Sequence, residues 1–175
     1  GSTSYVDTGY QPTANTKTMA FWVRFDRIDA NQYIGVDDGN ANRLFIGLDT
    51  NGYLAAGYGN GWGSGWNVNF KEGEWHHLAM VADFANDRAN VYIDGIYYSY
   101  LWFNTFTGTS DQNLHIGARR DSASIVNYLD GAIDDFVIYE KQLSATEVWD
   151  LANDNVPVDT SDPNLALYYT FDDIS

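Results

Sequence analysis

Short stretches in which apolar and polar residues alternate recur along this chain, with turn residues between them. In residues 17–25 every second position holds a large apolar side chain, from Met19 to Phe25. A period of two is typical of a strand that turns one face to a core. Asn-Gly at residues 51–52 and Asp-Gly at residues 94–95 mark tight hairpins. Further strands are predicted at residues 5–9, 32–36, 43–48, 53–57, 75–83, 89–93, 96–103 and 114–117.

A last strand, followed in the sequence by a short helix, is predicted in residues 131–148. Ser144 is followed three residues later by Glu147, which is the capping-box spacing at the start of a helix. The whole pattern predicts an all-β chain, a two-sheet antiparallel jelly-roll sandwich with one short C-terminal helix. In the strand before the helix, Ile133, Val137 and Tyr139 alternate with Asp134, Phe136 and Ile138.

The chain has the length of one domain, since 175 residues are enough to bury a core. We expect residues 1–175 to form a single sandwich. Residues 157–164 are predicted to form a short linker before a closing strand at residues 165–171. That strand either completes this sandwich or begins the next module of a tandem array.

Acidic residues dominate the charge, with 24 acids against 9 bases and a formal net charge of −15. This balance argues against nucleic acid or an anionic membrane as the partner, because both need a positive protein surface. No apolar run approaches the roughly 20 residues of a membrane span, so we expect no membrane insertion. The chain has no cysteine and therefore no disulfide framework.

Three ordered motifs resemble one known family. They are GEWHHLA at residues 73–79, VYIDG at residues 91–95 and GAIDDFVIYEKQLSATEV at residues 131–148. Their order and separation are similar to those of laminin G-like domains in the concanavalin A-like lectin and glucanase superfamily. The resemblance implies the jelly-roll fold. It also implies an extracellular or cell-surface location, as a module excised from a larger secreted bacterial protein.

The sequence lacks the usual catalytic patterns. Concanavalin A-like glucanases place acids at alternate positions of one strand, whereas the four glutamates of this chain form no such pattern. Asp134 and Asp135 are adjacent and would face opposite sides of a strand. The chain also lacks a G-x-S-x-G elbow and the spacing of a histidine zinc site. We therefore expect no enzymatic activity.

Calcium is the predicted cofactor. Asp38, Asn40 and Asn42 alternate in one loop, as oxygen donors do in the first half of a calcium loop. Arg43 then breaks the EF-hand pattern. An Asx-rich turn explains the same residues without a metal.

The resemblance adds two further groups of metal ligands. It implies that calcium and ligand gather at one rim of the sandwich, where Asp121 in the loop at residues 116–121 would contribute. It also implies a structural ion on the last predicted strand, which nominates Asp134 or Asp135, with Asp172 as a partner. The alternative is that these two acids accept backbone N–H groups in a turn.

A glycine-rich stretch carries the first set of predicted ligand residues. Glycines are poor strand formers, so the tryptophans among them are expected on a flexible segment near the surface. Exposed aromatic rings stack on sugars, while neighbouring amides bind hydroxyl groups. A segment that folds back and uses the tryptophans as anchors is the alternative. The predicted contacts are Tyr58, Asn60, Trp62 and Trp66.

An arginine-bearing loop carries the second set. Arg119 stands where the family resemblance would lead us to expect a carboxylate. With Arg120 and Asp121 it suggests a rim that binds a carboxylate or sulfate in bidentate fashion. Simple pairing with Asp37, Asp38 or Asp121 is the alternative.

Two functions follow from these patterns. The first is a non-catalytic, lectin-like carbohydrate-binding module, assisted by calcium, whose partner is a glycan or cell-surface polysaccharide. The second is a structural or protein-contact module in a tandem surface adhesin array, whose partner is a neighbouring protein domain. Trp22 offers a test of the site, because it lies opposite the core residues of its strand. A sheet face that displays Trp22 beside polar residues favours a groove binder, and a filled face favours the rim loops.

Overall fold

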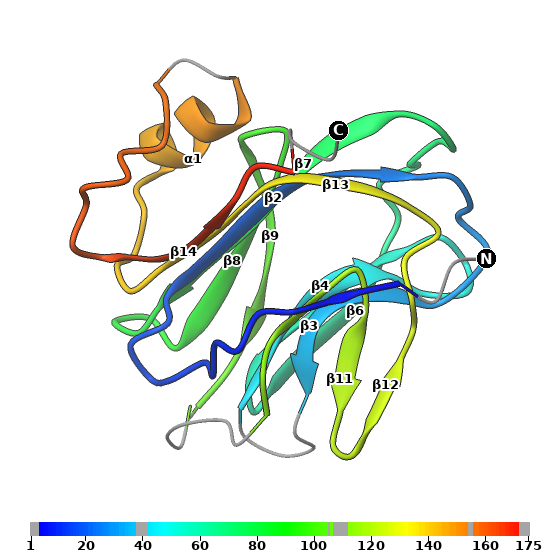
Figure 1. Ribbon diagram of the computed structural model, residues 1–175, viewed down its shortest axis with the longest axis horizontal. Coiled ribbons are helices and arrows are strands. Elements are labelled where there is room, and N and C mark those ends of the chain that lie inside the picture. The colour runs from blue at the N-terminus through cyan, green and yellow to red at the C-terminus, as the bar shows by residue number, and fades with distance from the viewer. Residues whose placement is uncertain (1–3, 38–41, 105, 107–111, 154–155, 172–175) are drawn as a thin grey trace.

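The computed structural model describes residues 4–37, 42–104, 106, 112–153 and 156–171, and it shows two sheets packed face to face (Figure 1). Neighbouring strands are antiparallel except for one parallel pair. In sheet A the order is β1 (Val6–Asp7), β10 (His115–Ile116), β3 (Gln32–Asp37), β4 (Arg43–Leu48), β5 (Leu54–Gly59) and β6 (Gly61–Trp66), with the hairpin of β11 (Arg119–Asp121) and β12 (Ser124–Val126) attached to β3. In sheet B the order is β14 (Leu165–Tyr169), β13 (Gly131–Tyr139), β2 (Thr18–Phe25), β7 (Trp75–Asp83), β8 (Arg88–Ile93) and β9 (Ile96–Trp102). The predicted jelly-roll sandwich is confirmed.

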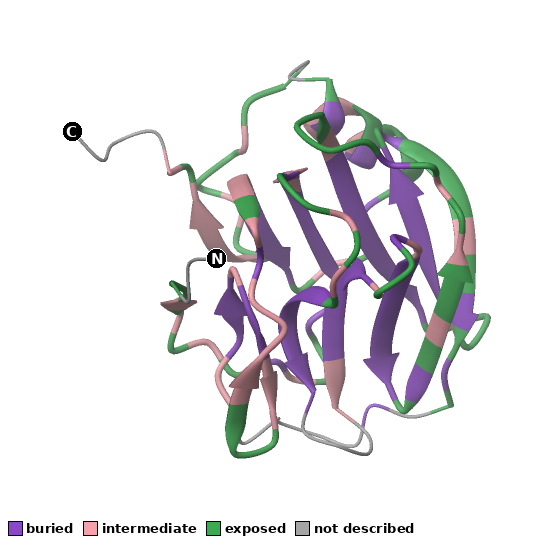
Figure 2. Cartoon of the chain, turned by 90° about the vertical axis from the view of Figure 1, so that its right-hand side faces the viewer, coloured by how far each residue is buried: buried purple, intermediate pink, exposed green. Residues whose placement is uncertain are grey.

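The core fills the space between the two sheets, and Figure 2 shows the buried residues concentrated in their strands. On β2, the apolar residues at every second position are fully buried, as the alternation predicted. Trp22 lies between them on the opposite, outer face of sheet B and is only half-buried. The outer face of β2 is itself buried at Thr18 and Ala20 and becomes partly exposed at Trp22 and Arg24.

Strand β13 does not keep the predicted alternation along its whole length. Its pairing with β2 shifts register between Asp134 and Val137, and Asp135 adopts a left-handed φ of 46°. This is a β-bulge, in which one extra residue reverses the faces that follow it. Phe136 therefore belongs to the core, while Val137 packs on the outer face of sheet B. The prediction that Ile133 and Val137 share a face is wrong for this reason.

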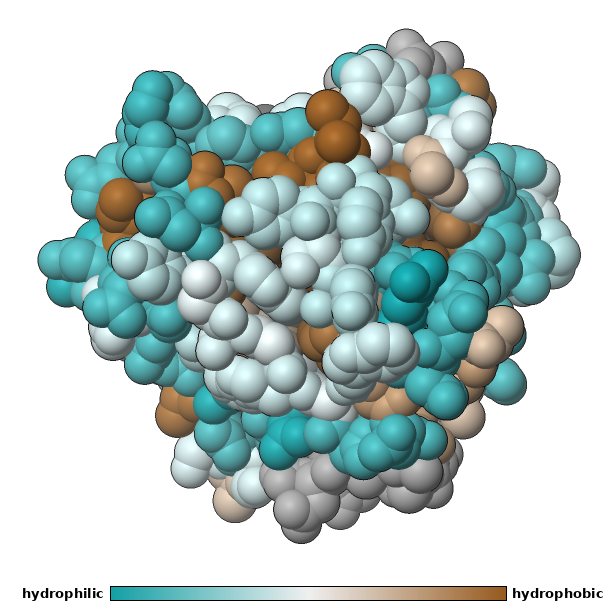
Figure 3. Space-filling model, turned by 180° about the vertical axis from the view of Figure 1, so that it is seen from behind, coloured by the Kyte–Doolittle hydropathy of each residue, from teal (hydrophilic) through white to brown (hydrophobic). Residues whose placement is uncertain are grey.

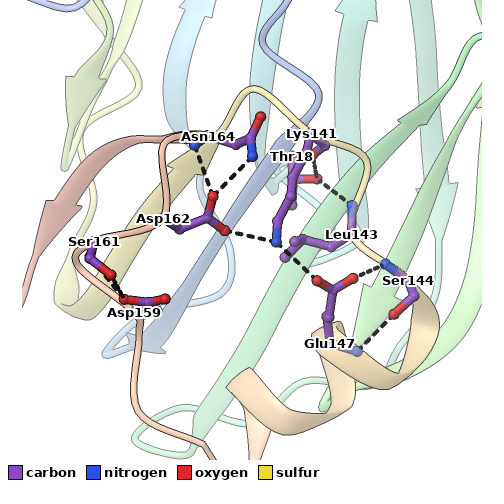
Figure 4. Close-up of polar contacts among 9 residues, drawn as sticks. All are labelled: Thr18, Lys141, Leu143, Ser144, Glu147, Asp159, Ser161, Asp162 and Asn164. Atoms are coloured by element: carbon purple, nitrogen blue, oxygen red, sulfur yellow. Dashed lines mark hydrogen bonds and ion pairs between the residues drawn. The ribbon is translucent and has the colours of Figure 1, made fainter.

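Helix α1 (Ala145–Ala152) covers part of the outer face of sheet B (Figure 1). The predicted capping box is present, because the Ser144 hydroxyl accepts from the Glu147 backbone N–H and the Glu147 carboxylate accepts from the Ser144 N–H. Lys141 joins the helix to the turn before β14, with its Nζ 3.0 Å from Glu147 and 2.8 Å from Asp162 (Figure 4). The hydrogen bond from Lys141, together with those from the backbone and side chain of Asn164, holds the pKa of the Asp162 carboxyl down at about 2.

The glycine-rich stretch is an ordered edge strand, β6, and not the flexible segment that was predicted. Its glycines permit close packing rather than disorder. A Cβ at Gly61 would lie 2.2 Å from the Trp102 carbonyl oxygen, and one at Gly63 would lie 2.4 Å from the Trp66 ring.

At the other end of the chain, β14 pairs with β13, so the closing strand belongs to this sheet. Within the described residues no helix is both long and apolar enough to cross a membrane.

Candidate functional site

The structure separates the four ligand residues predicted from the glycine-rich stretch. Tyr58 is fully buried and its hydroxyl donates to the Thr16 carbonyl at 2.5 Å, so its prediction as a ligand contact is wrong. Its strand position places it in the core. Trp66 packs against the core as an anchor, which was the alternative. Asn60 lies in the turn between β5 and β6, where its side chain accepts from the Asn104 N–H. Only Trp62 presents a largely exposed ring, at 46%.

Trp62 and Arg119 come together on the outer face of sheet A. The Trp62 ring lies 4.9 Å from that of Phe45, and the Arg119 guanidinium lies 5.0 Å from the same ring. Arg119 is already paired, with Nη2 donating to Asp121 at 2.8 Å and Nη1 3.6 Å from Asp37. Its pairing with acids, the alternative to ligand binding, is therefore what the structure shows.

Arg120 points into a different place, a polar pocket of about 380 Å³ near the N-terminal strand. Its Nε donates to Gln112 Oε1 at 2.8 Å and to the Ser122 carbonyl at 2.9 Å. Asp7 and the buried His115 also line this pocket. Arg119 and Arg120 thus do not form one anion clamp.

In the described part of the predicted calcium rim, the carboxylates are paired with arginines. Asp121 is bound to Arg119, and the neighbouring Asp37 pairs with both Arg119 and Arg43. Among the described parts of the chain, no three His, Asp or Glu side chains gather as a metal site would require. Asn42 is half-buried at the start of β4. The predicted ligands Asp38, Asn40 and Asp172 lie outside the described residues, so calcium stays a prediction.

The outer face of sheet B carries a groove of about 250 Å³ lined by Trp22, Trp75, Asp134 and Asp135. We call it the Trp22 groove. Two indole rings beside two carboxylates give it both an apolar surface for stacking and acceptors for hydroxyl groups. Trp75 is 41% exposed. This face displays Trp22 beside polar residues, the arrangement that favours a groove binder.

Strand register brings these four residues together. Trp22 pairs with His77 on β7 and with Asp134 on β13, while Arg24 pairs with Trp75. Trp22 and Trp75 are therefore diagonal neighbours across β2 and β7, within reach of one ligand. The Arg24 guanidinium lies over the Trp75 ring, 5.6 Å from its centre, and helps to orient it.

The bulge in β13 supplies the second carboxylate. In a regular strand Asp134 and Asp135 would face opposite sides, but the left-handed Asp135 keeps both on the outer face. The Asp135 N–H donates to Asp134 Oδ1 at 2.9 Å, and Tyr168 donates its hydroxyl to Asp135 Oδ1 at 3.0 Å. The family resemblance nominated these acids as metal ligands, and their place beside the tryptophans was missed.

Trp75 and His77 are the site residues that the sequence interpretation missed. Both lie in the GEWHHLA motif, at alternate positions of β7. Their shared face could be derived from that spacing, but their position opposite Trp22 depends on the pairing of β2 with β7. His77 is buried, and its ring lies 5.5 Å from that of Trp22 in an edge-to-face arrangement.

A family model described as the concanavalin A-like lectin/glucanases superfamily, of the laminin G type, matches residues 1–149. The chain belongs to this superfamily. Among curated proteins, no sequence matches this member of the superfamily.

Solved structures share the superfamily fold at low sequence identity. A carbohydrate-binding candidate from Bacteroides ovatus is 16% identical, with a TM-score of 0.73 over 97% of this chain and 49% of its own. The CBM40 module of the IT-sialidase from Ruminococcus gnavus, bound to α2,3-sialyllactose, is 14% identical, with a TM-score of 0.62 over 87% of this chain and 100% of its own. Domain 4 of the extracellular arabinanase AbnA from Geobacillus stearothermophilus, solved with arabinotriose, is 24% identical, with a TM-score of 0.56 over 87% of this chain and 82% of its own. The chain spans about half the length of the Bacteroides protein.

Proposed function

We propose that this chain is a non-catalytic carbohydrate-binding module and that it binds a glycan in the Trp22 groove. The groove itself is the observation that carries the proposal. It combines two diagonal indole rings with two adjacent carboxylates on an open sheet face. Sugar rings have apolar faces that stack on indoles, and their hydroxyl groups donate to carboxylates.

The solved relatives support this function. They include a carbohydrate-binding candidate, a sialidase CBM40 module and an arabinanase domain with a bound trisaccharide. In the Trp22 groove, the carboxylates of Asp134 and Asp135 sit next to each other on one bulge. Hydrolysis of a glycoside requires two carboxyl groups on opposite sides of the scissile bond. Binding without catalysis is therefore the better account of these acids.

In this proposal the chain acts outside the cell or at its surface, as a module of a larger secreted protein. The chain spans about half of the Bacteroides protein, which supports a modular arrangement. The tryptophans and carboxylates of the Trp22 groove are held by strand pairing and by hydrogen bonds to Asp134 and Asp135.

Protein contact is the second candidate function, and strand β9 is the observation that favours it. Figure 3 shows a broad area of intermediate hydropathy on the side of the molecule where β9 and β6 lie. Large side chains are exposed there along the edge of sheet B. They are Ile96, Tyr97, Tyr98, Tyr100 and Trp102, with exposed fractions from 36% to 62%.

Substitution of the groove tryptophans tests the proposal. A glycan array first identifies a bound glycan, and calorimetry with that glycan then compares the wild type with Trp22→Ala and Trp75→Ala. Each variant is expected to lose about tenfold in affinity, or ~1.4 kcal/mol, because a stacking surface is removed. Circular dichroism checks that both variants are folded.

Trp102→Ala is the matched control, since it removes an exposed indole from the same sheet at its far edge. It should bind like the wild type. Loss of binding in Trp102→Ala alone would move the glycan site to β9. An empty array would instead favour the protein-contact function.

A further inference from the structure

A second cavity, of about 280 Å³, adjoins the Trp22 groove beneath helix α1. Asp135 lines both spaces, and the ring of His77 in the cavity lies 5.5 Å from that of Trp22 in the groove. A ligand in the groove can therefore extend a substituent into this space, which we call the His77 cavity. Its lining consists of His77, Asp135, Val137, Leu151, Val156, Pro157, Val158 and Tyr168.

Most of the His77 cavity is apolar. Leu151 comes from α1 and Val137 from β13, and residues 156–158 add further apolar side chains to the lining. A sugar hydroxyl would lose its hydration against such a wall without gaining a partner. A methyl group, in contrast, would gain the free energy of apolar burial, about 0.8 kcal/mol for each buried carbon of that size.

The polar groups of the His77 cavity are few and lie together. His77 is 2% exposed, and its Nδ1 is buried with no hydrogen-bond partner among the described residues. A buried nitrogen without a partner costs free energy, which a ligand that bonds to it would recover. Asp135 and Tyr168 add a carboxylate and a hydroxyl, 3.0 Å apart.

The imidazole of His77 is neutral at physiological pH. Burial lowers its pKa to about 4, although the Asp94 carboxylate acts in the opposite direction. A neutral ring offers one N–H donor and one acceptor nitrogen, and so it suits an uncharged amide rather than an anion. The nearby Asp135 carboxylate also disfavours an anionic substituent.

We propose that the His77 cavity binds the acetamido group of an N-acetylated sugar whose ring lies in the Trp22 groove. This inference rests on the proposed glycan-binding function and names the sugar class. The methyl group packs on Leu151 and Val158, the amide N–H donates to Asp135, and the amide carbonyl accepts from the His77 ring. A sugar with a hydroxyl group at the same carbon would leave the apolar wall uncovered.

Matched pairs of sugars test the inference. An array carries each N-acetylhexosamine glycan beside the hexose glycan with the same linkage and stereochemistry. We expect binding of the acetylated member and about tenfold weaker or no binding of its partner. Equal binding, or a preference for the hexoses, overturns the acetamido inference and leaves the carbohydrate function intact. An empty array overturns both.

Two variants test which residues distinguish the acetylated sugar from the hexose. His77→Phe keeps a flat buried ring but removes both nitrogens, so the preference for the acetylated sugar over the hexose should fall about tenfold. Tyr168→Phe removes the hydroxyl that holds Asp135 and should reduce the same preference. The Tyr168→Phe variant also keeps the test valid if His77→Phe does not fold. Tyr97→Phe, on exposed β9, is the control and should behave like the wild type. An undiminished preference in both cavity variants would overturn the assignment.

Discussion

Arg119 lies almost fully buried on the outer face of sheet A, where its charge is balanced by two acids. Asp37 is 7% exposed and lies between Arg119 and Arg43. The flat guanidinium also covers Tyr33 and Phe45, with its centre 5.1 Å and 5.0 Å from their rings. Removal of one member of such a group leaves a buried charge with less compensation, so the role of Arg119 is structural.

Arg119→Met is expected to lower the free energy of unfolding by about 2 kcal/mol, because the buried Asp37 carboxylate loses an arginine partner. Guanidinium unfolding measures this change. Arg27→Met breaks the exposed pair with Asp29 and should leave the stability almost unchanged. Glycan affinity should be unchanged in both variants. A loss of affinity with unchanged stability in Arg119→Met would return the ligand site to the arginine-bearing loop.

Among the secondary-structure elements, helix α1 contributes to the candidate site because it forms one wall of the His77 cavity. Its inner face is apolar, with Val148 fully buried against sheet B and Leu151 lining the cavity. A helix of eight residues is too short to be stable alone, so its capping box and its packing hold it in place. Lys141 adds ion pairs to Glu147 and Asp162.

Ser144→Ala is expected to destabilise the protein by about 1 kcal/mol, because the first turn of α1 loses its side-chain acceptor. Urea unfolding gives the difference. Thr146→Ala is the matched control, since this exposed residue lies in the same turn but makes no cap and alanine favours helices. Its stability should equal or exceed that of the wild type. Similar losses in both variants would mean that the cap does not stabilise the helix.

The whole molecule carries a formal net charge of −15. Mutual repulsion of carboxylates is strongest in the compact native state, where the charges are closest. Salt shortens the range of this repulsion from about 30 Å at 0.01 M to about 8 Å at 0.15 M. The native protein should therefore gain stability as salt is added.

The melting temperature should rise by roughly 2–4 °C between these two salt concentrations, equivalent to about 1 kcal/mol. Differential scanning calorimetry measures the shift. A double variant with Glu72→Gln and Glu140→Gln carries two charges fewer at exposed positions and should shift less. A melting temperature that falls with salt would show that the ion pairs dominate over the net repulsion.

Local patterns of the sequence were sufficient to predict most strands, the core face of β2 and the start of α1. Alternation reports which side of a strand is apolar, and the spacing of Ser144 and Glu147 reports a capping box. Trp22 could be placed on the outer face in the same way. These inferences succeed because they depend only on neighbouring residues.

Tertiary structure alone decided the site. The bulge at Asp135 turns two adjacent acids to one face, and the pairing of β2 with β7 sets Trp75 and His77 beside Trp22. Tyr58 and Arg119 look like surface residues in the sequence, yet Tyr58 lies in the core and Arg119 lies buried between acids. The physical reason is that burial and partner choice depend on strands that are distant in the chain and meet only in the folded sandwich.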